Sequence, residues 1–131
     1  MYQPVVLVVD DDEDIRDTVA HMLDVRGFRV FAAADRDGAL SICRELNGDV
    51  DVLVADLSLP GDAGGALARD VAARCPSVKV VFVTGIPRHI ALTMGLVQPD
   101  APYLQKPVNP DVLAALLRSL LPQYAPRADD W

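Results

Sequence analysis

The chain has 131 residues, of which 51% are apolar, and a formal net charge of −7. This length fits one domain, since domains most often have about 100–150 residues, and the apolar content excludes an intrinsically disordered protein. The excess of 19 Asp and Glu over 12 Lys and Arg argues against a nucleic-acid-binding surface. No apolar run is long enough for a membrane span, and the N-terminus lacks the layout of a signal peptide. We therefore expect a cytoplasmic protein that binds neither nucleic acid nor a membrane.

Short apolar runs alternate with amphipathic stretches in the first half of the chain. The predicted elements are a strand at 5–9, a helix at 13–26, a strand at 29–33 and a helix at 35–46. The first run is continuous and β-branched, which is typical of a strand buried on both faces. Ile15, Val19 and Met22 recur at helical spacing, and Gly27 fits the C-terminal end of that helix. Asp35 is suited to the N-cap of the next helix.

The second half continues the alternation but contains one irregular segment. The predicted elements are a strand at 50–56, a helix at 66–74, a strand at 78–84, a strand at 103–105, and a helix at 110–120 with Asn109 as its N-cap. Between the last two strands, Pro87, Pro99 and Pro102 crowd the segment 85–102. The pattern there favours at most a short or irregular fourth helix, over 90–96.

Strands that alternate with helices indicate an α/β protein with a doubly wound parallel sheet. In such sheets, ligands bind outside the carboxyl ends of the strands. Asp10 and Asp11 follow the first predicted strand, Asp56 ends the third, Thr84 ends the fourth, and Lys106 follows the fifth. We therefore expect these side chains to converge at one edge of the sheet.

Three carboxylates held close together repel one another and need a cation to remain ionised. Oxygen ligands with positions left open for water suit Mg²⁺. A carboxylate beside Mg²⁺, a hydroxyl and an ammonium group is an arrangement that can accept a phosphoryl group, because phosphoryl transfer requires positive charge around the transferring oxygens. Asp56, Thr84 and Lys106 would supply these groups.

The strand-end motifs, taken together in this order and spacing, resemble the receiver domain of two-component response regulators. The similarity spans about residues 4–121, and the matching stretches are Val8-Val9-Asp10-Asp11, Asp56-Leu57-Ser58-Leu59-Pro60-Gly61, Val83-Thr84-Gly85 and Tyr103-Leu104-Gln105-Lys106-Pro107. The resemblance implies a flavodoxin-like fold, similar to that of chemotaxis regulators, with five parallel strands in the order 2-1-3-4-5 and five flanking helices. It also implies a receiver domain over 1–122, followed by a tail or the start of a linker at 123–131.

The resemblance assigns the acidic residues to acceptor and metal roles. Asp56 corresponds to the phosphoryl acceptor, and Asp10 and Asp11 to the acidic pair that binds Mg²⁺, with Asp11 as the more direct ligand. Ser58 would contribute its backbone carbonyl to the same metal. Mn²⁺ is an alternative to Mg²⁺ at such a site.

Further residues correspond to the family's phosphoryl-binding and switch positions. Thr84, Gly85 and Lys106 would contact the phosphoryl group. Tyr103 matches an aromatic switch residue that turns inward when Thr84 moves. The bond from Lys106 to Pro107 is similar to a cis peptide of the family. The proline-rich segment 85–102 departs from the family pattern, so the output surface is expected to differ.

The expected function is a signalling switch and not an enzyme, since the domain would catalyse only its own phosphorylation and dephosphorylation. The donor would be a sensor histidine kinase or a histidine phosphotransfer protein. The downstream partner would be another protein, with the domain itself a monomer or weak homodimer. The chain would be either a single-domain regulator or a receiver excised from a hybrid kinase or larger regulator.

Two other functions remain open at this point. A Mg²⁺-dependent aspartyl phosphatase would need a general acid two residues after its nucleophile, and that position holds Ser58. An interaction module that signals without phosphate is favoured by the unusual segment 85–102. The complete set of Asp11, Asp56, Thr84 and Lys106 argues against it.

Overall fold

The computed structural model describes residues 3–62 and 65–121. Five parallel strands form one sheet in the order β2-β1-β3-β4-β5, which confirms the predicted topology. The strands are β1 (Val5–Val9), β2 (Arg29–Ala33), β3 (Val52–Ala55), β4 (Lys79–Thr84) and β5 (Tyr103–Gln105). The order reverses between β1 and β3, so the carboxyl ends of these two strands flank the switch point where ligands bind in such sheets.

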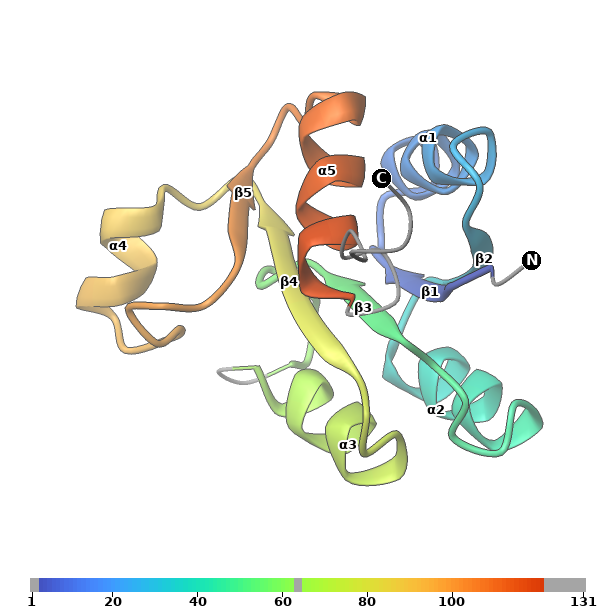
Figure 1. Ribbon diagram of the computed structural model, residues 1–131. Coiled ribbons are helices and arrows are strands. Elements are labelled where there is room, and N and C mark those ends of the chain that lie inside the picture. Colours follow the sequence, from blue (N-terminus) through green and yellow to red (C-terminus); the bar gives the residue numbers. More distant parts are fainter. Residues whose placement is uncertain (1–2, 63–64, 122–131) are drawn as a thin grey trace, which may run out of the picture.

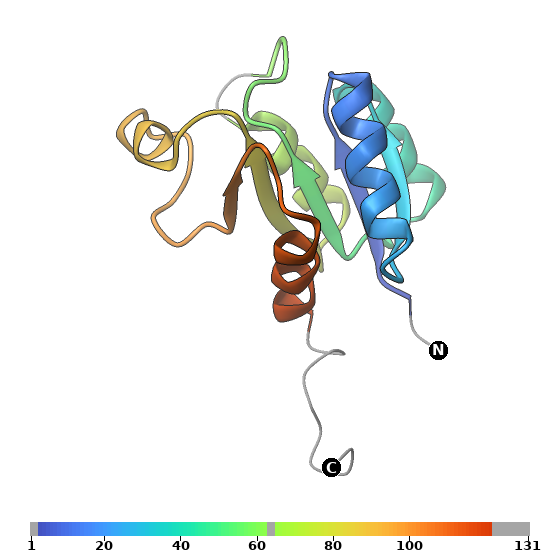
Figure 2. The same ribbon diagram turned by 90° about the horizontal axis from the view of Figure 1, so that it is seen from above.

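Helices cover both faces of the sheet, as predicted. They are α1 (Glu13–Asp24), α2 (Arg36–Glu45), α3 (Ala66–Arg74), α4 (Arg88–Thr93) and α5 (Pro110–Leu120). Helices α1 and α5 lie on one face and α2 and α3 on the other, whereas α4 projects beyond β5 at the edge of the sheet (Figures 1 and 2). Helix α4 is therefore the element least covered by the rest of the fold.

The continuous apolar run of β1 arises from burial on both of its faces. Val5, Leu7 and Val9 pack in the cluster beneath α2 and α3, and Val6 and Val8 pack in the cluster beneath α1 and α5. Side chains alternate between the faces of a strand, so a central strand covered by helices on both sides needs an apolar residue at every position. This packing fixes β1 at the centre of the sheet and thereby places the residue that follows it, Asp10.

Side-chain caps begin three of the helices. Asp12 accepts a hydrogen bond from the Ile15 amide, Asp35 accepts one from the Gly38 amide, and Asn109 accepts two from the amides of α5. Such bonds satisfy amides that have no partner within the helix. The predicted N-caps Asp35 and Asn109 are therefore confirmed. Asp12 is an N-cap as well.

Two predicted boundaries were wrong by two residues. Helix α1 ends at Asp24 and not at 26. Strand β3 begins at Val52 and not at 50, because its pairing with β4 starts where Val52 lies opposite Lys79.

The fourth helix is short, as predicted, but it lies at Arg88–Thr93 and not at 90–96. Pro87 is its N-cap residue, a place where the missing amide of proline costs no helical hydrogen bond. At the other end, Gly95 has a φ of 71°, a left-handed conformation that ends the helix.

Within residues 3–62 and 65–121, no helix is both long and apolar enough to cross a bilayer. The predicted tail at 123–131 lies outside the described residues. The predicted boundary at 122 therefore stays a prediction.

Candidate functional site

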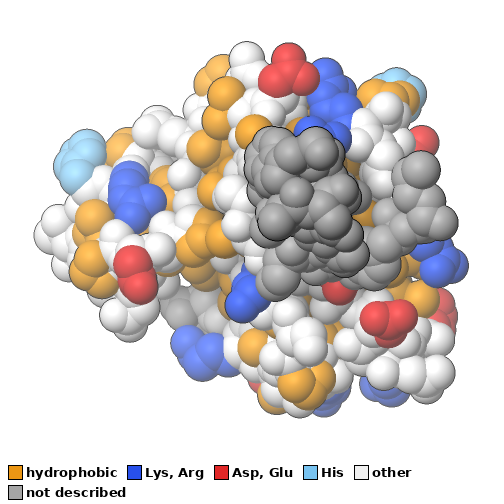
Figure 3. All heavy atoms as spheres, viewed as in Figure 1, with side chains coloured by type: hydrophobic (Ala, Val, Ile, Leu, Met, Phe, Trp, Pro, Cys, Tyr) orange, Lys and Arg blue, Asp and Glu red, His pale blue; other side chains and the backbone are white. Residues whose placement is uncertain are grey.

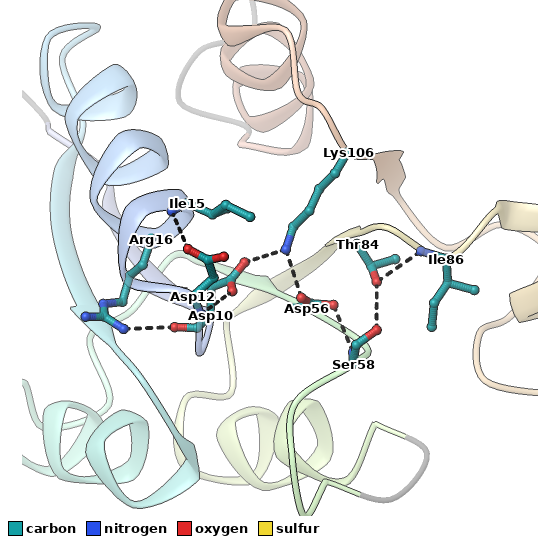
Figure 4. Close-up of polar contacts among 9 residues, drawn as sticks. All are labelled: Asp10, Asp12, Ile15, Arg16, Asp56, Ser58, Thr84, Ile86 and Lys106. Atoms are coloured by element: carbon teal, nitrogen blue, oxygen red, sulfur yellow. Dashed lines mark hydrogen bonds and ion pairs between the residues drawn. The ribbon is translucent and has the colours of Figure 1, made fainter.

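The strand register brings the predicted site residues to one edge of the sheet. Val9 of β1 lies opposite Ala55 of β3, so the next residues, Asp10 and Asp56, leave the sheet side by side. Thr84 of β4 lies opposite Gln105 of β5, and Lys106 follows directly. In Figure 4, Asp10, Asp56 and Lys106 point toward one another, and Thr84 lies beside them next to Ser58.

Three of these residues form an acidic cluster. Asp10, Asp11 and Asp56 each offer a carboxylate oxygen, and the three oxygens lie within 4.8 Å of one another. Asp10 and Asp56 are buried, whereas Asp11 is exposed. A purely oxygen donor set that is open on one side is the kind that Mg²⁺ prefers, since Mg²⁺ retains several waters. The cluster could therefore hold such a metal ion.

Lys106 is bonded to both buried carboxylates. Its Nζ atom lies 2.7 Å from Asp10 Oδ2 and 2.8 Å from Asp56 Oδ2. One positive charge thus lies between two negative charges in a part of the molecule with little solvent. Such charge-assisted bonds are stronger than neutral ones, so Lys106 keeps the two carboxylates close together despite their mutual repulsion.

The environment favours the charged forms of Asp56 and Lys106. Burial raises the pKa of Asp56, but hydrogen bonds from Lys106, the Ser58 amide and the Thr84 hydroxyl outweigh it, so the pKa lies below its ordinary value. Burial likewise lowers the pKa of Lys106, but the bonds to Asp10 and Asp56 outweigh it and raise the pKa. Asp56 is therefore an unprotonated carboxylate at neutral pH, as a nucleophile must be.

Backbone amides hold the second oxygen of each buried carboxylate. The Ser58 amide donates to Asp56 Oδ1 at 2.8 Å, and the Asp12 amide donates to Asp10 Oδ1 at 2.9 Å. With Lys106 on the Oδ2 atoms, both carboxylates are bonded through both oxygens. The rotation of each side chain is thereby fixed.

Hydroxyl groups continue the site on the side of β4. Thr84 is fully buried, its Oγ1 lies 3.4 Å from Ser58 Oγ, and it accepts a hydrogen bond from the Ile86 amide at 3.4 Å. Gly85, which follows Thr84, is exposed, and a Cβ added there would meet no atom within 4 Å. The end of β4 therefore offers a hydroxyl and uncrowded backbone next to Asp56.

Two features lie at the start and end of β5. Tyr103 is buried, and its hydroxyl donates a hydrogen bond to the carbonyl of Ile86. The Lys106–Pro107 peptide bond is cis. Tyr103 is thus joined directly to the loop that follows Thr84.

Two arginines near the site were missed from the sequence. Arg16 donates a hydrogen bond to the Asp10 carbonyl at 3.1 Å and so supports the backbone of the acidic loop. A cation near a helix N-terminus is unfavourable, and this could have marked Arg16. Arg88, which stacks on Tyr103, lies outside the helix predicted at 90–96, so the same argument could not mark it.

Known proteins resemble this chain over most of its length. The sequence matches the response regulator receiver domain family over residues 6–118. It is 31% identical to the aerobic respiration control protein ArcA of Escherichia coli, with 92% of this chain and 50% of ArcA covered. It is also 31% identical to the sensor kinase CckA of Brucella abortus, with 88% of this chain and 12% of the kinase covered. The chain thus spans half of one relative and a small part of the other.

A solved structure agrees with these matches. The crystal structure of a response regulator from Burkholderia pseudomallei, with a phosphorylated aspartic acid, a calcium ion and citrate, is 30% identical. It has a TM-score of 0.73, with 88% of this chain and 66% of that chain covered. The family match, the two relatives and the shared fold lead to one conclusion: the chain belongs to the response regulator receiver domain family.

Proposed function

We propose that the chain is a phosphorylation-dependent switch that accepts a phosphoryl group on Asp56. The observation that carries the proposal is the position of this carboxylate. It is ionised, buried, bonded to Lys106, and flanked by two further acids and the Thr84 hydroxyl. An isolated buried acid would be expected to protonate. Asp56 instead has the charge and the neighbours that a phosphoryl acceptor needs.

The donor in this proposal is a phosphohistidine on a sensor histidine kinase or a phosphotransfer protein. A carboxylate oxygen of Asp56 bonds to phosphorus while the bond from phosphorus to the imidazole nitrogen breaks, and the imidazole leaves with the electron pair. The product is an acyl phosphate on Asp56. Lys106 is placed to neutralise one phosphoryl oxygen, and Thr84 to donate a hydrogen bond to another.

Mg²⁺ is the metal that this donor set fits, with Asp10, Asp11, Asp56 and the Ser58 carbonyl as the ligands. When bound, the ion would neutralise negative charge on the transferring group. Asp11 is the exposed member of the cluster and can bind metal without losing a bond to Lys106. The Burkholderia pseudomallei relative contains a phosphorylated aspartic acid, which supports the acceptor role of Asp56. It also contains a calcium ion, which supports a metal site in this chain.

The output would pass through the surface around α4. A phosphoryl group at Asp56 would draw the Thr84 hydroxyl toward it and so displace Ile86, to which Tyr103 is bonded. Hydrophobic side chains lie at the surface over α4 (Figure 3), and Ile90 and Met94 are 40% and 64% exposed. An unidentified downstream protein would read the change at this surface.

The proposal is tested with a small phosphodonor such as acetyl phosphate. The protein is incubated with the donor and Mg²⁺, and its intact mass is measured. We expect a gain of one phosphoryl group that is abolished by chelating the metal and by Asp56→Asn. Asp49→Asn is the matched control, because Asp49 is exposed and lies before β3, at the opposite end of that strand. A gain that persists in Asp56→Asn would refute the proposal.

A further inference from the structure

Helix α4 has little to hold it in place. It has six residues, its N-cap Pro87 makes no side-chain cap, and Ala91 is its one buried residue. Isolated helices shorter than about 12 residues are marginal in water. The position of α4 therefore depends on contacts with the rest of the domain.

Arg88, the first residue of α4, makes three such contacts. Its Nη1 atom donates to the Ala101 carbonyl at 3.1 Å, and its Nη2 atom donates to the Pro99 carbonyl at 2.5 Å. The guanidinium carbon also lies 5.6 Å from the centre of the Tyr103 ring. A single planar cation thus joins the start of α4, the proline-rich loop and β5, which matches the preference of arginine for forked hydrogen bonds and aromatic faces.

Tyr103 is held at two points by these contacts. Arg88 lies over the face of its ring, and the ring hydroxyl donates to the Ile86 carbonyl. Tyr103 is 9% exposed and packs in a small cluster with Leu57 and Ala91. Because β5 is an edge strand, solvent beyond that edge offers the ring an alternative, outward position.

A continuous series of contacts connects this arrangement to Asp56. The Ser58 amide bonds to Asp56, and the Ser58 hydroxyl contacts that of Thr84. Thr84 in turn accepts from the Ile86 amide, and Ile86 accepts from Tyr103. Leu57, the residue after Asp56, lies in the same cluster as Tyr103. A change at Asp56 can therefore reach the ring on which Arg88 stacks.

We propose that Arg88 is a positioning residue that sets how often Tyr103 is turned inward, and thereby how readily the domain enters its phosphorylated conformation. The link to phosphorylation rests on the proposed function. The effect on Tyr103 does not, because it concerns the unmodified protein. A residue that stabilises the inward ring also favours every conformation of the domain in which the ring must be inward. The phosphorylated conformation is one of these.

The ring position is measured by fluorine NMR on protein labelled with 3-fluorotyrosine, with Tyr103→Phe identifying the signal. Arg88→Gln removes the cation. Arg88→Lys keeps a positive charge, but its ammonium group cannot bond both carbonyls and stack on the Tyr103 ring at the same time. Arg88→Gln loses the stabilisation of a cation–π contact and of charge-assisted hydrogen bonds. We therefore predict that the ratio of inward to outward rings falls about five- to thirtyfold in this variant. Arg88→Lys should lie between wild type and Arg88→Gln. Arg44→Gln, at an exposed position of α2, is the matched control and should leave the signal unchanged.

A second measurement tests the coupling. Beryllofluoride with Mg²⁺ imitates an aspartyl phosphate, and its apparent affinity should fall in Arg88→Gln in proportion to the fraction of inward rings measured for each protein. An unchanged ring signal in Arg88→Gln, even with a lower melting temperature, would show a merely structural role and overturn the proposal. An altered ring with unchanged beryllofluoride affinity would also overturn it.

The two proposals fail in distinguishable ways. If wild-type protein does not respond to beryllofluoride at all, the proposed function is contradicted. The ring ratio of the unmodified protein would still show whether Arg88 positions Tyr103.

Discussion

The ammonium group of Lys106 lies 2.8 Å from the Asp56 carboxylate, and each group shifts the pKa of the other toward its charged form. The two residues come from the ends of β5 and β3, which are separated in the sheet by β4. Asp10 shares the same ammonium group from the far side. One lysine therefore balances a site that would otherwise hold uncompensated negative charge.

Replacing Lys106 should destabilise the domain. In Lys106→Met, Asp10 and Asp56 lose their shared cation and repel each other, so we expect the free energy of unfolding to fall by about 2–4 kcal/mol. Lys79→Met is the matched control, because Lys79 is the other lysine of the chain and is exposed. Urea denaturation of both variants measures the difference. Equal stability of the two variants would contradict the role of Lys106.

The pKa shifts define a pH range of full stabilisation. The pKa of Asp56 lies below 3.8, so its contribution is present above that pH and is lost as the pH falls through the folded-state pKa. The pKa of Lys106 lies above 10.5, so its contribution is present below that pH and is lost as the pH rises through the folded-state value. We expect a plateau between these limits in urea midpoints measured against pH.

The variant Asp56→Asn isolates the acidic side of this profile. It has no titrating group at 56, so its stability should fall less steeply than that of wild type as the pH drops below about 4. Asp49→Asn should keep the wild-type slope, because Asp49 is exposed and lies at the opposite end of β3 from the site. If the stability of wild type and of Asp56→Asn fell equally steeply with decreasing pH, Asp56 would contribute nothing to acid denaturation.

Mg²⁺ should stabilise the folded protein through the acidic cluster. At a concentration about 100 times the dissociation constant, the expected gain is about 2.7 kcal/mol, seen as a rise in melting temperature. Asp11→Asn removes the exposed carboxylate and should require at least about tenfold more Mg²⁺ for the same rise. Asp17→Asn, an exposed acid of α1, is the control. Identical Mg²⁺ dependence in both variants would exclude Asp11 as a ligand.

The phosphorylated protein should lose its phosphoryl group slowly. Hydrolysis needs a positioned water, and the residues flanking the site, Ser58 and Ile86, carry neither an acid nor an amide side chain. Ser58→Asn would add an amide at an exposed position and should speed the loss severalfold. The rate is followed by intact mass after the donor is removed. Loss from wild type within seconds would contradict the prediction.

Two glycines with positive φ provide a test of close packing. A Cβ at Gly48 would lie 2.5 Å from the Arg74 carbonyl oxygen, whereas one at Gly27 would meet nothing within 4 Å. Gly27→Ala should therefore cost only the backbone strain, about 1–2 kcal/mol. Gly48→Ala should cost about 3–4 kcal/mol, because the backbone of Arg74 must also move. Similar urea midpoints for the two variants would contradict this view of the turn after α2.

Much of the fold was predictable because its signals are local. The unbroken apolar run at Val5–Val9 indicates a strand covered on both faces. Asp35 and Asn109 are N-cap residues that predict the start of the helices that follow them. The helix in the proline-rich segment was harder to predict, because three prolines interrupt the helical spacing of the apolar residues there. Pro87 is the N-cap residue of α4, which begins two residues and ends three residues before the predicted helix.

The sequence alone determined which chemical groups stand at the strand ends, since alternating strands and helices bring those ends to one edge. Only the tertiary structure decided which atoms meet. Lys106 and Asp10 are 96 residues apart, and their contact depends on the register of separate strands. Arg88 stacks on Tyr103 because α4 folds back against β5. Periodicity and capping act between neighbours in the chain, whereas such contacts depend on how all the segments pack together.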